Sequence, residues 1–490
     1  MAAQHPVLGI SIYRDSGKTI TAQVYEAIQK RIVSGELTSG SGLPPTRGLA
    51  SDLGISRSTI VTAYEQLTAE GYIEGQPGSG YVICPIGPVE LGAAESSSRN
   101  GDQSSSHAPA TSRPTAAPPH ADEPQGPLPF QPGWPDMRLF PYAKWAQAVS
   151  RVARTSPKSL ITGGGTFGDI ELRKAVAAHI AEWRGVSASP HQIMITAGSG
   201  DAVEICIRSL TMEGRSIGLE NPGYRPLQHF VSSLGVAPQW LNIDASGAEL
   251  PRNPGNNLPP KLVVLTPSHQ FPLGGTMSPA RRIEYLNWAE ASDSWIIEDD
   301  YDSEFRYAGR PIPAMAGLDK NDRTIYVGSF SKIFSNALRL GYLVIPERLI
   351  PRFTETISRF GKKASISPQR PLATFIAQGE FYRHLRRMRR IYGDRRRGLI
   401  ELLNRYLDTK YEIKDHQAGM QIVVNLPRGA KDVAIAVEAS RHNMLPRALS
   451  NYFGTSGGRP GLILGFCSHS PEELQSSVIE LNKLIAKSVS

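Results

Sequence analysis

The sequence predicts a chain of several parts: a small α+β module, a linker, and a large α/β domain that ends in a smaller α+β subdomain. A length of 490 residues exceeds that of one ordinary domain. From Ala93 to Gly126 the chain contains no Val, Ile, Leu, Met, Phe, Tyr or Trp, which is typical of a flexible, disordered linker. After this stretch, apolar strand-like runs alternate with helical patterns, which predicts a mostly parallel sheet covered by helices. We therefore expect domains over 1–85 and 128–490, joined by a linker over 86–127.

The composition indicates a soluble protein of a reducing compartment. Hydrophobic residues make up 40% and charged residues 20% of the chain. Cys84, Cys206 and Cys467 lie far apart and match no metal-ligand spacing, so we expect neither a disulfide framework nor a metal site. No apolar run approaches the roughly 20 residues that cross a bilayer, and the N-terminus lacks the basic start of a signal peptide. We expect a cytoplasmic location and no membrane partner.

The positive charge of the chain lies in its large domain. The net charge is +8 and the pI is near 9.3. Residues 1–85 hold 6 Lys and Arg against 7 Asp and Glu, whereas residues 128–490 hold 45 against 33. This excess suggests a polyanionic partner, although charge alone does not identify it.

Residues 1–85 predict three helices followed by a β-hairpin. Apolar residues recur every four positions over 20–32, which predicts a helix with one apolar stripe. A short second helix is expected over 47–53, and a third helix over 57–70, between glycines that end them. Two β-runs around a Gly/Pro turn predict the hairpin over 72–83. Three helices and a hairpin in this order form a winged helix-turn-helix.

Four residues of this module are placed where DNA contacts are expected. Arg47 begins the second helix, where phosphate contact is common. Arg57 and Thr59 lie at the start of the third helix, the end that would enter a major groove. Gly78 lies at the hairpin tip, which is small enough to follow a minor groove. The alternative is that all four belong to ordinary solvated caps and a turn, an interpretation that the local charge favours.

The segment over 43–83, LPPTRGLASDLGISRSTIVTAYEQLTAEGYIEGQPGSGYVI, resembles the GntR family of bacterial winged-helix regulators almost position by position. The resemblance implies binding to double-stranded promoter or operator DNA in a bacterial cytoplasm. It also implies that Arg47, Arg57, Thr59 and Gly78 are the DNA-contact positions.

Residues 128–490 predict the alternating strands and helices of an α/β domain. The clearest strands are expected over 192–196, 216–220, 261–266, 295–299, 324–329 and 340–345, and helices over 170–183, 201–212 and 279–291. From about residue 370 onward, long helices mix with strands near 421–426 and 462–466. This last part predicts the smaller α+β subdomain.

Four segments at the ends of predicted strands carry candidate chemistry. Small residues over 196–201 expose backbone N–H groups at the start of a helix, which suits a phosphate. Tyr224 follows a strand and could stack on a flat ring. Asp299 ends an apolar strand, where a carboxylate needs a cation such as a protonated pyridine. Lys332 follows another strand and could form a Schiff base. Taken singly, each segment also fits an ordinary loop, a packed tyrosine, an acidic cap or a solvated lysine.

Three longer segments resemble one known class of protein. They are TPSHQFPLGG over 266–275, IIEDDYDSEFRY over 296–307 and YVGSFSKIFSNALRLGYLVIP over 326–346. Residues from about 128 to 488 resemble a fold-type I aminotransferase. The whole chain, with its GntR-like module and linker, resembles the MocR/GabR family of transcriptional regulators.

This resemblance implies pyridoxal 5′-phosphate (PLP) as the cofactor, held as a Schiff base on Lys332. It implies that Asp299 pairs with the pyridine nitrogen, that Tyr301 lies near the phenolic oxygen, and that Tyr224 stacks on the ring. The residues implied to bind the phosphate are Ser199, Gly200, Ser329, Ser331 and Arg339. The family further implies a homodimer and a small-molecule amine, or PLP itself, as the effector.

Three departures from the family pattern affect the ligand site. Gly163–Thr166 stands where related regulators have a tyrosine-containing segment that reaches the neighbouring subunit's phosphate. The late strand over 461–466 is apolar where aminotransferases carry a carboxylate-binding arginine, and Arg459 is the closest candidate in the sequence. Arg225 supplies another arginine, shifted from the position that an amino-acid ligand would need.

One basic segment has two interpretations. Tyr382–Arg397, YRHLRRMRRIYGDRRR, contains eight arginines. We favour a solvated helix face with Leu385, Met388 and Tyr392 packed inward. A contact with the DNA backbone or with a second subunit is the alternative.

Three functions remain open at the level of sequence. The leading hypothesis is a regulator whose aminotransferase-like domain senses an amine through PLP on Lys332, without completing turnover. The second is an active aminotransferase with an attached DNA-binding module, in which Lys332 also moves the proton. The third is a domain that has lost the cofactor and only dimerises the DNA-binding modules.

Overall fold

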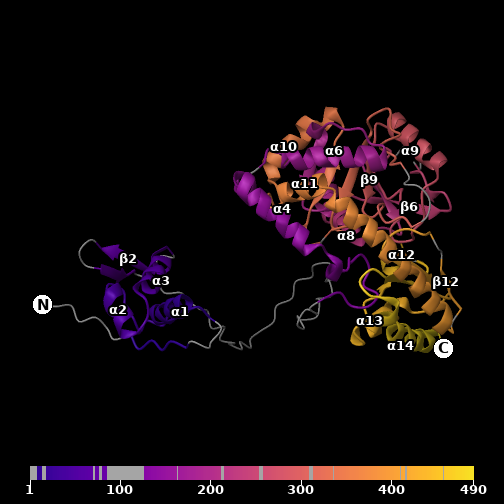
Figure 1. Ribbon diagram of the computed structural model, residues 1–490. Coiled ribbons are helices and arrows are strands. Elements are labelled where there is room, and N and C mark those ends of the chain that lie inside the picture. The colour runs from indigo at the N-terminus through magenta and orange to yellow at the C-terminus, as the bar shows by residue number, and fades with distance from the viewer. Residues whose placement is uncertain are drawn as a thin grey trace, which may run out of the picture. The chain divides into compact units, whose positions relative to one another are not determined.

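The computed structural model divides into two units, residues 1–116 and 117–490 (Figure 1). The residues that it describes are 8–13, 18–69, 72–76, 80–84, 126–162, 164–210, 215–252, 258–307, 313–334, 336–408, 410–413, 416–455 and 457–489. Gly78 and all but the last two residues of the predicted linker lie outside these ranges. Among the helices that the structure describes, none combines the length and apolar character needed to span a bilayer.

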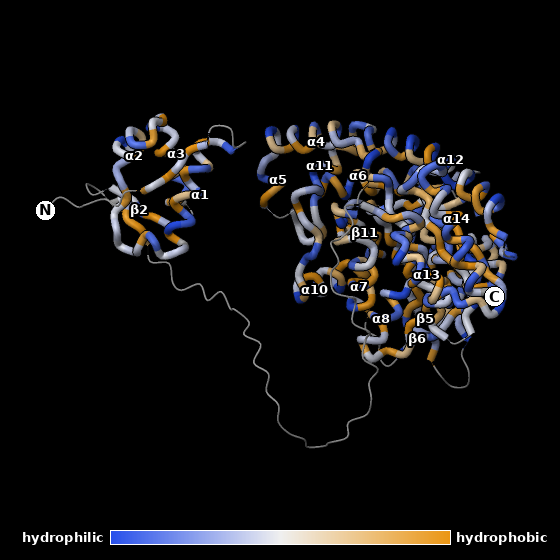
Figure 2. The backbone as a smooth tube through the Cα atoms, turned by 90° about the horizontal axis from the view of Figure 1, so that it is seen from below, coloured by the Kyte–Doolittle hydropathy of each residue, from blue (hydrophilic) through white to orange (hydrophobic). Residues whose placement is uncertain are grey.

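The N-terminal unit contains the predicted helices and hairpin. The helices are α1 (Ile20–Val33), α2 (Thr46–Asp52) and α3 (Arg57–Ala69). The hairpin strands β2 (Ile73–Gln76) and β3 (Gly80–Ile83) pair antiparallel, and a short strand β1 (Gly42–Leu43), which was not predicted, adds to β3. In Figure 2, hydrophobic and hydrophilic residues alternate along these helices, as amphipathic packing requires.

Local contacts fix the angle between α2 and α3. Gly54 adopts the left-handed conformation (φ +61°) between the two helices, where a residue with a side chain is disfavoured. The Ser56 side chain then accepts a hydrogen bond from the backbone N–H of Thr59 (3.3 Å), as a helix N-cap does. The buried Tyr64 of α3 donates to the carbonyl of Pro44, just before α2 (2.9 Å). The start of α3 is therefore held at a defined position.

The second unit is built on an eight-stranded sheet in the order β4-β11-β10-β9-β8-β5-β6-β7. The strands are β4 (Ile193–Thr196), β5 (Ile217–Asn221), β6 (Pro238–Asp244), β7 (Gly247–Ala248), β8 (Leu262–Leu265), β9 (Trp295–Asp300), β10 (Thr324–Ser329) and β11 (Gly341–Val344). The six predicted strands are confirmed within two residues, whereas β6 and β7 were not predicted. The expectation of a mostly parallel sheet holds from β10 to β6, but β11 runs antiparallel to both of its neighbours.

Helices cover both faces of this sheet (Figure 1). They are α4 (Tyr142–Thr155), α5 (Lys158–Ile161), α6 (Ile170–Arg184), α7 (Ser199–Ser209), α8 (Arg225–Ser233), α9 (Pro279–Ala291), α10 (Ile350–Phe360) and α11 (Gln369–Ala377). Short 3-10 turns occupy Met137–Leu139, Pro190–Gln192, Asn336–Leu338, Glu347–Leu349 and Leu449–Tyr452. Successive residues of β4 enter different cores, Ile193 and Ile195 on one side and Met194 on the other. A strand buried on both faces explains the continuous apolar runs in the sequence.

The smaller subdomain contains a second, fully antiparallel sheet in the order β12-β13-β15-β14. Its strands are β12 (Glu412–Ile413), β13 (Gln421–Asn425), β14 (Arg447–Ala448) and β15 (Gly461–Gly465), and its helices are α12 (Glu380–Tyr406), α13 (Asp432–Arg441) and α14 (Pro471–Val489). The strands predicted near 421–426 and 462–466 are confirmed as β13 and β15.

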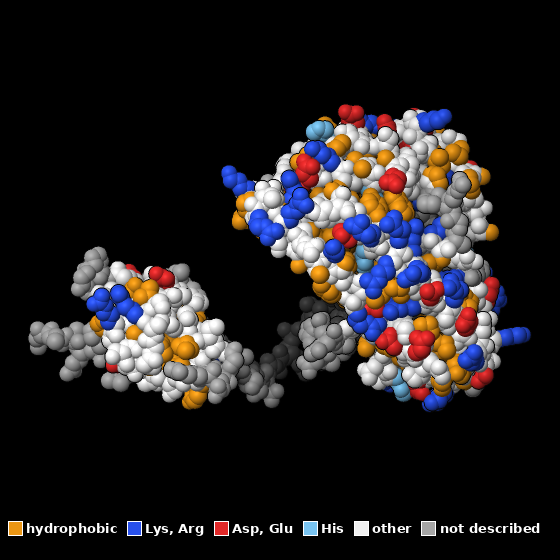
Figure 3. Space-filling view, in the orientation of Figure 1, with side chains coloured by type: hydrophobic (Ala, Val, Ile, Leu, Met, Phe, Trp, Pro, Cys, Tyr) orange, Lys and Arg blue, Asp and Glu red, His pale blue; other side chains and the backbone are white. Residues whose placement is uncertain are grey.

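The arginine-rich segment forms the first half of α12. Leu385, Met388 and Tyr392 are buried, as predicted. Arg386, Arg387 and Arg390 are exposed, and Figure 3 shows Lys and Arg side chains gathered on the face where α12 lies. The segment is not only a solvated face, however. Arg395 is buried and bonds to the carboxylate of Asp136 (2.9 Å), because the helix packs there against the chain that follows the linker.

The first residues after the linker join the smaller subdomain. The carbonyl of Phe130 accepts a hydrogen bond from the N–H of Gly465 in β15 (2.8 Å), and the carbonyl of Pro129 accepts one from Leu445 (2.8 Å). Phe130 itself is fully buried. This segment therefore packs beside β15 and continues to Gly133 and Asp136.

Candidate functional site

Strand register brings two loops to the same edge of the large sheet. Gly341 of β11 pairs with Thr196 at the end of β4 and with Ser329 at the end of β10. The residues that follow those two strand ends therefore lie on either side of β11. A Cβ on Gly341 would lie 2.8 Å from the carbonyl carbon of Gly198, so glycine is required for the close approach. All predicted phosphate ligands belong to these two loops: Ser199, Gly200, Ser329, Ser331 and Arg339.

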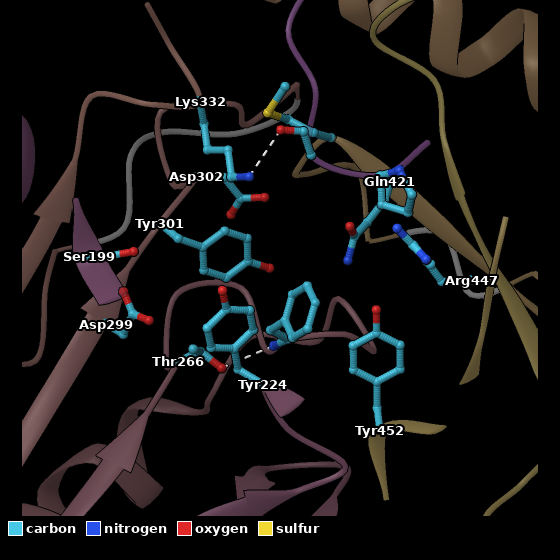
Figure 4. Close-up of a pocket in the computed structure, with 14 residues that line it drawn as sticks. Ser199, Tyr224, Thr266, Asp299, Tyr301, Asp302, Lys332, Gln421, Arg447 and Tyr452 are labelled. Atoms are coloured by element: carbon cyan, nitrogen blue, oxygen red, sulfur yellow. Dashed lines mark hydrogen bonds between the residues drawn. The ribbon is translucent and has the colours of Figure 1, made fainter. Parts of the chain in front are cut away.

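A pocket of about 240 Å³ opens at this edge, between the large sheet and the smaller subdomain (Figure 4). Five of the residues predicted to bind the cofactor line it: Ser199, Tyr224, Asp299, Tyr301 and Lys332. Gly200, Ser329, Ser331 and Arg339 are not among its lining residues. The Ser329 side chain accepts a hydrogen bond from the N–H of Ser331 (3.2 Å), and Arg339 is exposed with φ +45°.

Lys332 lies on the short connection that follows β10. Its amine donates a hydrogen bond to the carbonyl of Gly133 (3.0 Å), in the segment that follows the linker. The side chain is half-buried, and this burial lowers the pKa of the amine below its ordinary value. A lowered pKa increases the neutral fraction of the amine, which is the form that attacks a carbonyl carbon.

Asp299, near the end of β9, is a half-buried carboxylate that forms no ion pair with the residues that the structure describes. Its Oδ1 is shielded from solvent and makes no hydrogen bond with the residues that the structure describes. Burial, and then the nearby carboxylates of Asp300, Glu220 and Asp302, raises its pKa to about 7. The adjacent Asp300 differs, because it lies 2.7 Å from Arg184 Nε and accepts a hydrogen bond from Tyr326 (2.6 Å). An unpaired acid of this kind is costly unless a ligand supplies the positive charge.

Tyr301 belongs to a hydrogen-bonded group in the pocket wall. Its hydroxyl lies 2.9 Å from Nδ1 of His269, and the same nitrogen lies 2.9 and 3.1 Å from the two carboxylate oxygens of Asp302. Burial and the carboxylates of Asp302 and Asp299 raise the pKa of Tyr301 well above its ordinary value, so the phenol keeps its proton. His269 and Asp302 were not predicted as site residues, although both lie in the segments that carried the family resemblance.

Aromatic rings form one side of the pocket. Phe271 contacts Tyr224, Tyr301 and Tyr452 edge-on, with centroid separations of 5.8, 5.7 and 5.5 Å. Tyr224 is 46% exposed in this chain, so its ring face is available to a ligand. The N–H of Phe271 bonds to the hydroxyl oxygen of Thr266 (3.0 Å), which fixes the turn that carries the ring.

The smaller subdomain supplies the opposite wall through Gln421, Arg447 and Tyr452 (Figure 4). Arg447 lies on β14 beside Ile463 of β15, so the basic side chain comes from the strand next to the apolar one. The buried Gln421 has an amide nitrogen without a hydrogen-bond partner among the described residues. Arg459, the closest candidate in the sequence, is exposed and is not among the residues that line this pocket. Arg225 also lies outside the lining, at the start of α8.

Two of the predicted DNA-contact residues that the structure describes are exposed. Arg47 in the first turn of α2 and Arg57 at the start of α3 are both exposed, and Arg57 Nε lies 3.5 Å from the hydroxyl of Thr46. Thr59 is half-buried, with its N–H bonded to the Ser56 cap. Arg47 and Arg57 therefore present guanidinium groups from adjacent helix ends, as a helix-turn-helix requires.

The pocket residues fit PLP chemically. The cofactor needs an amine for its aldehyde, a carboxylate for its protonated pyridine nitrogen and a donor for its phenolic oxygen, and Lys332, Asp299 and Tyr301 offer these groups. The buried Asp299 Oδ1 without a partner supports this fit most directly, because a pyridinium would restore the missing charge. The helix α7 begins beside the pocket with Ser199, and its free N–H groups suit a phosphate.

Two family models match the two units. Residues 20–83 match the bacterial regulatory proteins of the gntR family, and residues 135–463 match aminotransferase class I and II. The chain thus combines a DNA-binding winged helix with a fold-type I aminotransferase domain, the class whose enzymes depend on PLP.

Relatives that align over most of this chain are named as regulatory proteins. The probable rhizopine catabolism regulatory protein MocR of Rhizobium meliloti is 36% identical, over 96% of this chain and 94% of its own. The HTH-type pyridoxine biosynthesis transcriptional regulator PdxR of Corynebacterium glutamicum is 32% identical, over 98% and 99% of the two chains. The HTH-type transcriptional regulator TauR of Rhodobacter capsulatus is 30% identical over 76% and 77%. The chain belongs to the MocR family of GntR-type transcriptional regulators.

Solved structures agree on the fold of the second unit. An archaeal alanine:glyoxylate aminotransferase superposes with a TM-score of 0.67 at 25% identity, over 74% of this chain and 92% of its own. The α-aminoadipate aminotransferase LysN of Thermus thermophilus gives 0.64 at 24% identity, over 74% and 92%.

Proposed function

We propose that this protein is a PLP-dependent regulator that binds operator DNA through its first unit and senses a small amine, or PLP itself, through its second. The observation that carries the proposal is the unpaired Asp299 carboxylate in one pocket with the Lys332 amine, in a chain that begins with a GntR-type module. A DNA-binding role implies action in the bacterial cytoplasm, where the DNA is.

In this proposal Lys332 Nζ would hold PLP covalently through the carbon of its aldehyde group. An incoming amine would bond to that carbon and release Lys332 as a free amine. Asp299 holds the charge of the pyridine nitrogen, Tyr301 faces the phenolic oxygen and Tyr224 covers the ring. Ser199, Gly200, Ser329, Ser331 and Arg339 surround the phosphate. Support comes from the register that brings the two predicted phosphate loops to one sheet edge. Reduction of the purified protein with borohydride, followed by peptide mass mapping, tests it: the modification is expected on Lys332 and on no other lysine.

The effector that best fits the pocket is an amine that also carries an anionic group. Its amine would meet Lys332, and its anion would meet Arg447 and the free amide of Gln421 on the opposite wall. Arg447 forms no ion pair with the part of the chain that the structure describes, and a guanidinium in this situation favours a carboxylate, sulfonate or similar group. Aminotransferases carry the carboxylate-binding arginine on the strand that corresponds to β15, which is apolar here. In this chain Arg447 of the neighbouring strand β14 would take that role.

We further expect a homodimer, because sites of this fold are shared between subunits and because a dimer presents two DNA-binding modules to two half-sites. The linker over 86–127 would set their reach, and two linked modules bind more tightly than one without new contacts. Sedimentation of the full chain tests the oligomeric state directly.

An active aminotransferase remains the second candidate, because Lys332 lies in the pocket as an amine with a lowered pKa that could also move a proton. The two functions differ in product. A sensor holds the added amine without releasing a keto acid, whereas an aminotransferase releases keto acid over many turnovers. Quantifying keto acid per subunit after addition of an amino acid separates them. Protein that never takes up PLP would instead favour a domain that only dimerises the DNA-binding modules.

A further inference from the structure

We propose that His269 and Asp302 are positioning residues that leave the Tyr301 hydroxyl free to donate its hydrogen only into the pocket, toward the bound cofactor. This inference rests on the proposed function, in that PLP occupies the pocket. It assigns a role to two buried residues outside the predicted site, and it concerns the direction of one hydrogen bond.

The geometry joins three side chains at a single nitrogen. Nδ1 of His269 lies 2.9 Å from Oδ1 and 3.1 Å from Oδ2 of Asp302, and 2.9 Å from the hydroxyl of Tyr301. His269 is only 4% exposed and Asp302 only 2%. Water therefore does not compete for these contacts.

Hydrogen counting decides the donors. An ionised carboxylate can only accept, so the contact between Asp302 and His269 requires a hydrogen on Nδ1. This requirement is the same for the neutral tautomer that carries Nδ1–H and for the imidazolium. A nitrogen that carries a hydrogen has no lone pair for the Tyr301 hydroxyl. The Tyr301 oxygen can therefore only accept from His269, and its own hydrogen must go elsewhere.

The hydrogen of Tyr301 points toward the ligand space. Tyr301 makes no second hydrogen bond among the residues that the structure describes. Its phenol stays protonated, because burial and the nearby carboxylates raise its pKa well above the ordinary value. In Figure 4 the Tyr301 hydroxyl points toward the middle of the pocket residues that are drawn.

Two glycines hold the imidazole in this orientation. A Cβ on Gly419 would collide with Cε1 of His269, and a Cβ on Gly274 would lie 3.3 Å from its Nε2. The ring is thus packed along its Cε1–Nε2 edge, while Nδ1 contacts Asp302 and Tyr301. The ring centroids of His269 and Tyr301 lie 5.9 Å apart.

Three substitutions separate positioning from packing. His269→Leu removes the donor, His269→Asn keeps an N–H near the place of Nδ1, and Tyr301→Phe removes the hydroxyl. Each variant is loaded with PLP, and two quantities are measured at one fixed pH: the visible absorbance spectrum and the dissociation constant of PLP. We expect His269→Leu and Tyr301→Phe to change the spectrum alike and to weaken PLP binding about tenfold, as loss of one hydrogen bond does. His269→Asn should restore both quantities to near the wild-type values.

The double variant His269→Leu/Tyr301→Phe gives the decisive comparison, because residues that act through one another are not additive. It should match Tyr301→Phe alone. Additive effects, or a His269→Leu protein that is less heat-stable but keeps the wild-type spectrum and PLP affinity, would overturn the inference. Wild-type protein that takes up no PLP would overturn the proposed function and this inference together. In that outcome the wild type and all variants would show the same absorbance spectrum and no PLP binding.

Discussion

The amine of Lys332 donates a 3.0 Å hydrogen bond to the carbonyl of Gly133, a residue 199 positions earlier in the chain. Gly133 has φ +72°, a conformation that favours glycine, and a Cβ there would lie 2.6 Å from Lys332 Nζ. The same segment is bonded to β15 through Phe130 and begins where the predicted linker ends. A covalent bond at Nζ removes hydrogens from the amine and changes this contact. Under the proposed function, the state of Lys332 would therefore alter its contact with the segment that follows the linker.

Lys332→Ala should abolish covalent uptake of PLP while leaving the fold intact. The substitution removes one hydrogen bond, worth about 1 kcal/mol, and no core side chain. The measurement is borohydride reduction and peptide mapping, with heat denaturation as the check on folding. Lys320→Ala, at an exposed lysine, is the matched control and should load normally. Label on another lysine in the wild-type protein would show that Lys332 is not the attachment site.

Asp299→Asn should raise the stability of the cofactor-free protein at neutral pH and weaken PLP binding. Because the pKa of Asp299 is about 7 in the folded protein and about 4 when unfolded, the folded state binds more protons between these values. Stability therefore falls as pH rises from about 4 to about 7. The asparagine variant does not show this fall in stability with pH. Its free energy of unfolding should therefore exceed that of the wild type by roughly 2 to 4 kcal/mol near pH 8.

Urea denaturation of the cofactor-free proteins at several pH values measures this difference. Part of the slope should remain in the variant, because burial also raises the pKa of Glu220 to about 7. An unchanged pH dependence in Asp299→Asn would mean that its carboxylate already has a partner.

Arg447→Gln should weaken the binding of anionic amines roughly tenfold or more, because it removes a charge-assisted hydrogen bond. Amines of similar size that carry no anionic group should bind the variant and the wild type with the same affinity. Arg459→Gln is the control, since that arginine is exposed outside the pocket. Titration of the PLP spectrum with amino acids and with simple amines gives both affinities. If Arg459→Gln has the larger effect, the anion binds elsewhere.

Substitutions in the first unit should separate base reading from phosphate contact. Arg57→Ala should weaken binding to the specific site by roughly 1–3 kcal/mol. Arg47→Ala should weaken binding to every sequence and flatten the dependence on salt. Gel shifts at several salt concentrations, on specific and unrelated DNA, measure both effects. Equal affinity of both variants and the wild type at fixed salt would exclude this docking mode.

Much of the fold could be predicted because its signals are local. The four-residue period over 20–32 predicted α1. The continuous apolar runs predicted six of the eight strands of the large sheet. The two-residue strands β1 and β14 could not be found, because such short segments carry no periodicity. The direction of β11 was also missed, since apolar composition does not distinguish parallel from antiparallel pairing.

In the candidate site too, residues with a local sequence signal were predicted and residues placed by long-range contacts were missed. Lys332 and Asp299 were predicted because strand ends and family segments mark them. Arg447 was missed because its place opposite Lys332 depends on how the smaller subdomain packs against the sheet, and Gly133 was missed because it contacts Lys332 across 199 residues. Contacts of this length depend on tertiary structure and leave no pattern in the sequence.

The most direct test of the account is the affinity of the full chain for the promoter fragment beside its own gene, with and without PLP, followed by addition of individual amino acids. Fluorescence anisotropy at fixed salt gives each dissociation constant. The account predicts that PLP, or an amino acid added to the PLP-loaded protein, changes the wild-type affinity at least fivefold, and that Lys332→Ala shows no such change. Equal affinities for wild type and Lys332→Ala under all these conditions would contradict it.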